Sequence, residues 1–389
     1  MMNFKTLDNF DFKNKFVIVR ADINSDVVSG KIKMNERIIE SSKTILELLN
    51  KKAKVVVIAH QGNPGKDDFI NLSQHAKLLN EFVRIKFIDD IVGEKAIRSI
   101  KSLKAGEALL LDNIRNLEEE IDPSKTPNRI KALGKLFDIY VNDAFSVCHR
   151  AHSSIVELPK SVPFSCVGRI LEKELKALEK ISINDCIYLL GGAKPEENIK
   201  LLKGKKVLSG GLFAQLCLVA SGKNLGYQNE FLKKATLIKG DYNEFLKLLK
   251  TKLTNVEMPV DFAVDENGER REYSLEEFPL SYEIEDIGAK TLSHYLDEIN
   301  KASAIYMKGP FGNTSIEKYA KGTIEILKAI SKSKAFSLIG GGHLSDAIKM
   351  SGIPTKKFGH ISLSGGALLN YIAGEKLPGL VALGIMNNS

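Results

Sequence analysis

The first half of the sequence places cationic and hydrogen-bonding side chains directly after short apolar runs. Two such runs, residues 16–19 and 55–58, have the composition of buried strands. Because the carboxyl ends of parallel strands meet at one edge of a sheet, the side chains that follow them should share a crevice. The cationic members of this set are Arg20, Arg37, His60, Arg115, His149, Arg150 and His152. Arginine binds carboxylate and phosphate through two parallel hydrogen bonds, so this edge is predicted to hold a small, doubly anionic ligand.

The histidines raise the alternative of a metal site. His149 and His152 are three residues apart, but no partner carboxylate with the spacing of an HExxH motif accompanies them. A single histidine in a loop is more often a structural hydrogen-bonding residue. We therefore predict no metal site built from protein side chains.

Glycine takes the place of charge at the strand ends of the second half. Four glycine-containing turns follow apolar runs, at residues 191–194, 209–211, 309–312 and 340–343. Glycine lets backbone N–H groups approach an anion, and Lys194 adds a positive charge before the helix start at Pro195. One such turn is more often only a tight turn, but four in succession predict a nucleotide site. The chain has no GxxxxGK[ST] loop, so the predicted site is not of the Walker A kind.

The elements that must position these residues alternate along the chain. Further strand-like apolar runs are residues 108–111, 139–141, 187–190, 206–208, 304–307 and 336–339. Helical periodicity marks residues 35–50 and 72–83. This alternation predicts an α/β fold of two Rossmann-like domains, each a mostly parallel sheet flanked by helices.

The length of 389 residues exceeds what one hydrophobic core usually supports, which favours two domains. Pro159 and Pro163 interrupt the pattern, and residues 169–181 have the spacing of a charged amphipathic helix. We expect an N-terminal domain over residues 1–168, a hinge helix over 169–182, a C-terminal domain over 183–370 and a tail over 371–389.

The net charge of +8 favours anionic partners, which include nucleic acid, membrane surfaces and small phosphorylated molecules. No nucleic-acid-binding module is recognisable, and no stretch reaches the roughly 18 apolar residues of a membrane span. The four cysteines form no CxxC pair, which excludes zinc-finger and redox-dithiol spacings. Sparse cysteine and the lack of an apolar leader predict a cytoplasmic protein.

At this point the motifs resemble those of the phosphoglycerate kinase family over nearly the whole chain. The family's opening Arg-x-Asp-x-Asn and helix-starting Arg match Arg20, Asp22, Asn24 and Arg37. The remaining shared motifs are VNDAF at 141–145, HRAH at 149–152, GGAK at 191–194, DIG with KT at 286–291, GGG at 340–342, and HIS with GGA at 360–367. Variants that resemble the archaeal branch are AHQG at 59–62, PVDFAVD at 259–265, GER at 268–270 and GGGH at 340–343.

The resemblance implies the reaction 1,3-bisphosphoglycerate + ADP ⇌ 3-phosphoglycerate + ATP. It implies that the first domain binds the glycerate compound, that the second binds ATP or ADP, and that the C-terminal tail returns to the first domain. Mg²⁺ would be held mainly by the nucleotide phosphates, with no prosthetic group, and the protein would be a monomer, with a dimer as the alternative.

The resemblance also assigns the site residues. The implied substrate-binding residues are Asp22, Ile23, Asn24, Arg37, His60, Gln61, Gly62, Asn63, Arg115 and Arg150. The implied nucleotide-binding residues are Gly191, Gly192, Ala193, Lys194, Gly210, Gly211, Gly312, Ser315, Gly340, Gly341, Gly342 and His343. Those implied to act on the transferring phosphoryl group are Arg37, Lys194, Gly341 and Gly342. No general base is needed, because the acceptor carboxylate is already ionised.

Several positions depart from the usual family pattern. Asn63 replaces an Arg, Asn198 a second Lys, and His343 an Asp, and the usual Thr-Gly pair of the closing loop is Leu363-Ser364. Within residues 308–315, Lys308 replaces an Asn and Ser315 a Glu whose carboxylate usually meets the ribose hydroxyls. The missing Glu predicts weaker or less selective nucleotide binding.

An active kinase is the leading hypothesis. A family-derived nucleotide-binding or scaffolding protein with weakened catalysis is the second, because the departures gather around the nucleotide. The chain retains Arg37, Lys194 and the glycines, which argues against a loss of catalysis. Another α/β nucleotide enzyme, such as a dehydrogenase, is disfavoured because no strand is followed by a complete GxGxxG.

Overall fold

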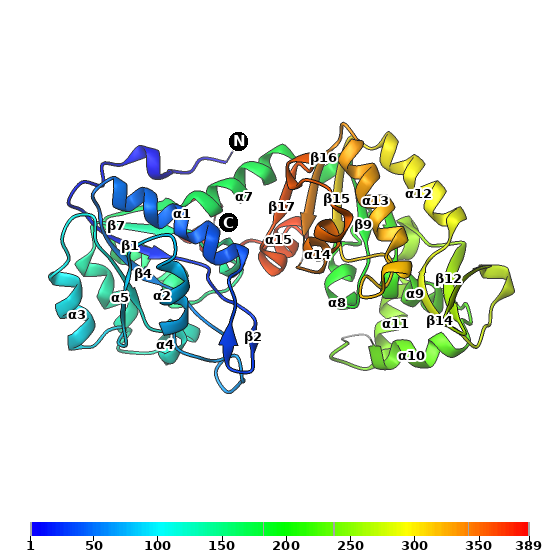
Figure 1. The fold of residues 1–389 in the computed structure, drawn as a ribbon, viewed down its shortest axis with the longest axis horizontal. Helices are drawn as coiled ribbons and strands as arrows, with labels where there is room; N and C mark the ends of the chain where they lie inside the picture. The colour runs from blue at the N-terminus through cyan, green and yellow to red at the C-terminus, as the bar shows by residue number, and fades with distance from the viewer. Residues whose placement is uncertain (1, 182, 236–237, 341, 388–389) are drawn as a thin grey trace. The chain divides into compact units, whose positions relative to one another are not determined.

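The computed structural model describes residues 2–181, 183–235, 238–340 and 342–387. They divide into two compact units, one made of Met1–Lys176 with Gly374–Ser389 and the other of Ala177–Ala373. Each unit contains a six-stranded parallel sheet with helices beside it (Figure 1). The predicted α/β fold with two mostly parallel sheets is therefore confirmed.

The sheet of the first unit has the strand order β5-β6-β4-β1-β7-β8, and every neighbouring pair is parallel. Its strands are β1 (Phe16–Arg20), β4 (Lys54–Ile58), β5 (Lys86–Ile88), β6 (Ala108–Leu111), β7 (Ile139–Asn142) and β8 (Phe164–Val167). Its helices are α1 (Glu36–Asn50), α2 (Ser73–Leu79), α3 (Glu94–Lys101), α4 (Glu118–Ile121), α5 (Arg129–Leu133), α6 (Ser153–Val156) and α16 (Pro378–Ala382). A small hairpin pairs β2 (Val27–Val28) with β3 (Lys31–Ile32).

Both faces of this sheet are buried, which explains why its strands are continuous apolar runs. Successive side chains of a strand point to opposite faces. Val17 and Val19 accordingly pack in one core cluster with residues of α1 and α2, whereas Ile18 packs in another with residues of α3 and α5. Parallel strands covered on both faces have this sequence pattern, and the helices are amphipathic to match.

Asparagine side chains set two of the helix ends in the first unit. Asn35 precedes α1, and its Oδ1 accepts a hydrogen bond from the Ile38 N–H at 3.1 Å, so the helix begins where the periodicity predicts. The helix predicted over residues 72–83 is shorter in the structure and ends at Leu79. Asn80 stops it, because its side chain donates to the Ile85 carbonyl and accepts from the Ile85 N–H.

The second unit contains the sheet β11-β10-β9-β15-β16-β17, again with parallel pairs throughout. Its strands are β9 (Cys186–Leu190), β10 (Val207–Ser209), β11 (Val256–Glu257), β15 (Ala304–Lys308), β16 (Phe336–Gly340) and β17 (His360–Ser362). An antiparallel sheet of order β13-β12-β14 is formed by β12 (Asp261–Glu266), β13 (Glu269–Ser274) and β14 (Glu283–Ile287). The helices are α8 (Pro195–Asn198), α9 (Gly211–Ala220), α10 (Tyr227–Ala235), α11 (Tyr242–Lys250), α12 (Ala289–Lys301), α13 (Lys321–Lys332), α14 (Gly342–Ser351) and α15 (Gly365–Ile372).

Helix α7 (Arg169–Lys180) contains the junction between the two units, since the first ends at Lys176 and the second begins at Ala177. The last part of the chain belongs to the first unit, where the Gly379 N–H donates to the Cys148 carbonyl at 2.9 Å. All four cysteines are buried and unpaired. Among the described residues, no helix is both long enough and apolar enough to cross a bilayer.

Candidate functional site

The strand ends of the first unit bring cationic side chains together around His60. Burial, followed by the charges of Arg20, Arg115 and Arg150, holds the pKa of His60 well below its usual value. Arg20 is the last residue of β1, Arg115 and Arg150 follow β6 and β7, and His60 follows β4, so four neighbouring strands supply the group. We call Arg20, His60, Arg115 and Arg150 the basic cluster. Its cations can neutralise an anion of more than one negative charge.

A buried hydrogen-bond network fixes the positions of Arg20 and His60 in the basic cluster. Arg20 is fully buried, and its Nε donates to Ser154 Oγ at 2.9 Å, while Ser154 Oγ donates to Glu120 Oε1 at 2.7 Å. Arg20 Nη2 lies 3.2 Å from His60 Nδ1. Because a guanidinium can only donate, His60 Nδ1 accepts this bond, and the proton of the neutral ring is on Nε2. His60 is thereby prepared as a hydrogen-bond donor.

Arg115 has hydrogen-bonding capacity that no described residue uses. Its Nη1 donates to the Gly62 carbonyl and to Asn63 Oδ1, the latter at 2.9 Å. Its Nε and Nη2 are buried, and within the described residues neither has a hydrogen-bond partner. Burial lowers its pKa to about 10, with Arg150 and Arg20 contributing. Buried donors without partners cost free energy, and an anion placed beside Arg115 would supply the missing acceptors.

Asp22 and Asn24 organise the neighbouring loops. Asp22 forms an ion pair with Arg37, and Asn24 Oδ1 accepts from the Gly62 N–H at 2.8 Å. Gln61 is fully buried, and its side chain bonds to the backbone N–H and carbonyl of Ser25 at 2.8 and 2.9 Å. These contacts lock the loop after β1 onto the loop after β4. Gln61 therefore holds the loops together rather than presenting its amide to a ligand.

The remaining predicted residues of the first unit differ in their surroundings. Ile23 is fully buried among apolar side chains, so of this residue the backbone alone is available to a ligand. Burial, with the charge of Arg150 next, lowers the pKa of His149. His152 Nδ1 lies 3.6 Å from Glu120 Oε1, which adds this histidine to the network behind the cluster.

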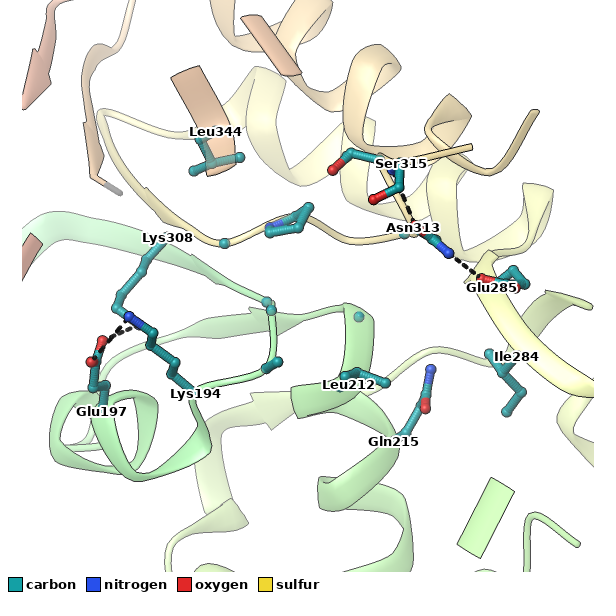
Figure 2. Close-up of a pocket in the computed structure, with 18 of the residues that line it drawn as sticks. Lys194, Glu197, Leu212, Gln215, Ile284, Glu285, Lys308, Asn313, Ser315 and Leu344 are labelled. Carbon is teal, nitrogen blue, oxygen red and sulfur yellow. Dashed lines mark hydrogen bonds and ion pairs between the residues drawn. The ribbon is translucent and has the colours of Figure 1, made fainter. Parts of the chain in front are cut away.

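The second unit contains a pocket of about 440 Å³ at the carboxyl ends of its strands. The predicted nucleotide-binding residues that line it are Gly191, Gly192, Ala193, Lys194, Gly211, Gly312, Ser315 and Gly340. Lining residues that the motifs did not assign to the site include Glu197, Leu212, Gln215, Phe231, Glu283, Ile284, Glu285, Asn313 and Leu344. Figure 2 shows Lys194, Glu197 and Lys308 at one end of the pocket and Glu285, Asn313 and Ile284 at the other.

The glycines beside this pocket serve loop packing as well as ligand access. A Cβ on Gly191 would lie 2.2 Å from the Pro310 carbonyl oxygen, and one on Gly210 would lie 2.1 Å from the Phe311 ring. The amides of Gly191 and Gly192 donate to the carbonyls of Lys308 and Pro310 at 2.8 and 2.9 Å. Gly210 and Gly211 also donate to backbone carbonyls. These four amides are thus engaged within the protein, whereas the side chains of Lys194 and Lys308 line the pocket beside them.

Two lysines share one carboxylate at the cationic end of the pocket. Glu197 Oε2 lies 3.0 Å from Lys308 Nζ, and Glu197 Oε1 lies 3.9 Å from Lys194 Nζ (Figure 2). Lys308 Nζ also donates to Asn198 Oδ1 at 3.0 Å. Lys308 and Asn198, both departures from the usual family pattern, are therefore in direct contact.

The opposite end of the pocket is acidic and polar. Asn313 Nδ2 donates to Glu285 Oε2 at 2.9 Å, and Asn313 Oδ1 accepts from the Ser315 N–H at 3.1 Å (Figure 2). Burial and the neighbouring charge of Glu285 raise the pKa of Glu283. Carboxylates therefore line this end although Ser315 itself carries none.

Comparisons with known proteins decide the family. The model of the family described as phosphoglycerate kinase matches residues 7–375. This chain belongs to the phosphoglycerate kinase family. The phosphoglycerate kinase of Methanopyrus kandleri is 38% identical over 397 residues, covering 98% of this chain and 97% of the relative, and that of Methanobacterium bryantii is 40% identical, covering 96% of each.

Solved structures of the family agree with this assignment. The phosphoglycerate kinase of Pyrococcus horikoshii superposes with a TM-score of 0.85 at 38% identity, covering 98% of each chain. That of Coxiella burnetii gives a TM-score of 0.80 at 27% identity, covering 98% of this chain and 99% of the other. The predicted resemblance is confirmed, and the comparisons give no support to the scaffolding alternative.

Some family motifs support the fold rather than line the pocket. Asp286, of the DIG motif, accepts hydrogen bonds from Arg270 at 3.2 Å and from the Gly322 N–H at 2.9 Å. Asp261 accepts from the N–H groups of Lys290 and Thr291, which caps α12. A motif found by spacing can thus mark a helix cap as readily as a ligand contact.

Part of the predicted nucleotide set is not covered by the structure. Gly341 lies outside the described residues, and so does the side chain of His343, although Gly342 and His343 belong to α14. Within the ranges that the structure describes, no three His, Cys, Asp or Glu side chains are close enough together to bind a metal ion.

Proposed function

We propose that this chain catalyses reversible phosphoryl transfer between 1,3-bisphosphoglycerate and ADP, as its family membership implies. The observation that carries the proposal is Arg115, whose buried Nε and Nη2 have no partner among the described residues, beside His60 and Arg150. Such a group is costly unless an anion completes its hydrogen bonds. A substrate with a carboxylate and a phosphate satisfies that requirement.

The basic cluster binds 3-phosphoglycerate in this proposal. Arg115 and Arg150 bind its anionic groups with charge-assisted hydrogen bonds, and His60 donates from Nε2 because Arg20 occupies Nδ1. Asp22 orients Arg37, which stabilises the negative charge that develops on the transferring phosphoryl group. Asn24, Gln61, Gly62 and Asn63 complete the binding loops.

The pocket of the second unit binds ATP or ADP. The phosphates lie at the end that carries Lys194, and the nucleoside lies toward Glu285 and Ser315. Glu283 and Glu285 offer carboxylates to the ribose hydroxyls, which compensates in part for the Glu that is missing at Ser315. Mg²⁺ enters with the nucleotide, and when bound it neutralises charge on the phosphate oxygens.

The two ligands are assigned to different units, so transfer requires them to come into line. We assign the hinge to α7, which contains the junction at residues 176–177. Closure excludes water from the transferring group and so limits hydrolysis of ATP.

A coupled assay on the full chain tests the proposal. The wild-type protein should form ADP from ATP only when 3-phosphoglycerate is present. Lys194→Ala should reduce kcat by about 100-fold or more, because a phosphoryl-stabilising charge is lost. Lys206→Ala is the matched control, since Lys206 pairs with Glu257 and Glu298 outside the pocket. Lack of turnover in the wild type, or equal activity in Lys194→Ala, would refute the assignment.

A further inference from the structure

Lys308 occupies an unusual place for a lysine. It is the last residue of the central strand β15, where it pairs in register with Leu190 of β9 and Gly340 of β16. It is only 8% exposed, and burial lowers its pKa. Lysine is almost never this buried without a partner, because desolvating an ammonium is expensive. The position of Lys308 between two glycine turns therefore needs an explanation from its contacts.

Asn198 holds the ammonium of Lys308 in a defined direction. Asn198 is fully buried, and its Nδ2 donates to the Gly191 carbonyl at 3.0 Å. A carbonyl can only accept, so the nitrogen of the amide faces Gly191 and the oxygen is left for Lys308. The side chain of Asn198 thus connects the glycine turn after β9 to the cation at the end of β15.

The cationic end of the pocket has more positive charge than its one shared carboxylate neutralises. Lys194 and Lys308 both interact with Glu197, which leaves one net positive charge among the three groups. An ammonium has three N–H donors, and Glu197 and Asn198 account for two of those on Lys308. The amides of Gly191, Gly192, Gly210 and Gly211 are already engaged with backbone carbonyls, so an anion here would meet the two lysine ammonium groups in place of those four amides.

We propose that Lys308 is a second phosphate-binding cation of the nucleotide pocket, directed by Asn198 and paired with Glu197 until a nucleotide phosphate displaces that carboxylate. The inference rests on the proposed function, since it takes the ligand of this pocket to be ATP or ADP. It makes two predictions of opposite sign. Removing the charge of Lys308 should weaken nucleotide binding, whereas removing the competing charge of Glu197 should strengthen it.

Calorimetric titration of the full chain with ATP, ADP and adenosine tests both predictions. Lys308→Asn should weaken ATP and ADP binding by about 10- to 100-fold, the range expected for a hydrogen bond to a charged group. Adenosine carries no phosphate, so its affinity should be unchanged, which also shows that the variant pocket is folded. Glu197→Gln should bind ATP about 2- to 5-fold more tightly, as expected when a competing carboxylate is removed. Lys206→Asn, which removes a lysine paired with two carboxylates outside the pocket, should bind all three ligands as the wild type does.

The outcomes separate this inference from the function on which it rests. Unchanged ATP affinity in Lys308→Asn, an equal loss of adenosine and ATP binding, or weaker ATP binding in Glu197→Gln would overturn the inference and leave the kinase assignment intact. Failure of the wild-type chain to bind ATP or ADP would overturn the proposed function and the inference together.

Discussion

The adjacent residues Glu119 and Glu120 make it possible to measure how much the buried carboxylate beside Arg20 of the basic cluster contributes to stability. Glu120 is fully buried and accepts hydrogen bonds from Ser154 N and Oγ at 2.8 and 2.7 Å, with Arg20 Nη2 at 4.0 Å. Glu119 is also buried, but it pairs with Arg129, whose side chain is 54% exposed. The two glutamates therefore differ chiefly in whether the partner cation can return to water.

Glu120→Gln should destabilise the first unit far more than Glu119→Gln. Breaking a buried pair by neutralising one partner costs about 3–5 kcal/mol, and the retained amide oxygen favours the lower end. The half-exposed Arg129 can be hydrated once its partner is neutral, so Glu119→Gln should cost about 1 kcal/mol or less. The first unit has 192 residues (176 from the N-terminus and 16 from the C-terminus). For a unit of that size, a loss of 1 kcal/mol lowers Tm by about 2–4 °C. The expected loss of Tm is therefore about 6–12 °C for Glu120→Gln, taken at about 3 kcal/mol, and at most about 4 °C for Glu119→Gln.

Denaturant unfolding followed by hydrogen exchange of peptides from β1 and β7 measures the first unit alone. This readout matters because a chain of two units need not unfold in one step. A similar loss of unfolding free energy in both variants would refute the reasoning, since it would mean that Arg20 does not depend on Glu120 for neutralisation. A large loss for Glu120→Gln alone would support it.

Three further predictions concern the loops, the hinge helix and the substrate. Gly309→Ala should weaken nucleotide binding by about 10-fold or more in a fluorescence titration. Gly309 has φ +78°, and a Cβ added there would lie 2.4 Å from the Gly191 carbonyl oxygen. Gly240→Ala is the control and should bind nucleotide normally, because a Cβ added at Gly240 would have no atom within 4 Å. Asp143 Oδ1 accepts a hydrogen bond from the Ile170 N–H of the hinge helix α7 at 2.8 Å. Burial raises the pKa of Asp143 from 3.8 to about 7, so between these values the folded chain holds a proton that the unfolded chain has lost, and stability falls as pH rises. Asparagine does not titrate, so Asp143→Asn should lack this pH dependence of stability. Its unfolding free energy relative to the wild type should therefore rise by up to about 1.4 kcal/mol per pH unit until pH 7. A difference between the two proteins that does not change with pH would contradict the raised pKa of Asp143. Arg115→Met should weaken 3-phosphoglycerate binding about 100-fold by calorimetry without loss of Tm, whereas lower Tm with normal affinity would indicate a structural role.

Much of the fold and part of the site were predictable from the sequence because their signals are local. A parallel strand buried on both faces is an apolar run wherever it occurs, and the residue after it lies at the edge where ligands bind. For that reason His60 and Arg115 could be assigned to one edge before any contact was known. The end of α2 was not predictable in this way, because Asn80 stops the helix through a hydrogen bond to Ile85 that periodicity does not report.

The candidate site was less completely predictable because several of its determinants are pairs distant in sequence. Glu120 carries no motif, yet it lies against Arg20 and Ser154 only because α4 and α6 are brought to the end of β1. The glycine pattern predicted anion-binding amides, but the loops after β9, β10 and β15 use their Gly191 and Gly211 amides to bind one another.

The order of residue types along the chain determined the fold class, the strand ends and the family, since each depends on periodicity or on motifs within a few residues. The tertiary structure decided what those residues do to one another. Asn198 and Lys308 are 110 positions apart in sequence and look like two unrelated departures, but pairing of β15 beside β9 places their side chains 3.0 Å apart. Hydrogen bonds, burial and shared charge depend on such distances, so the electrostatic character of the pocket is a property of the folded chain.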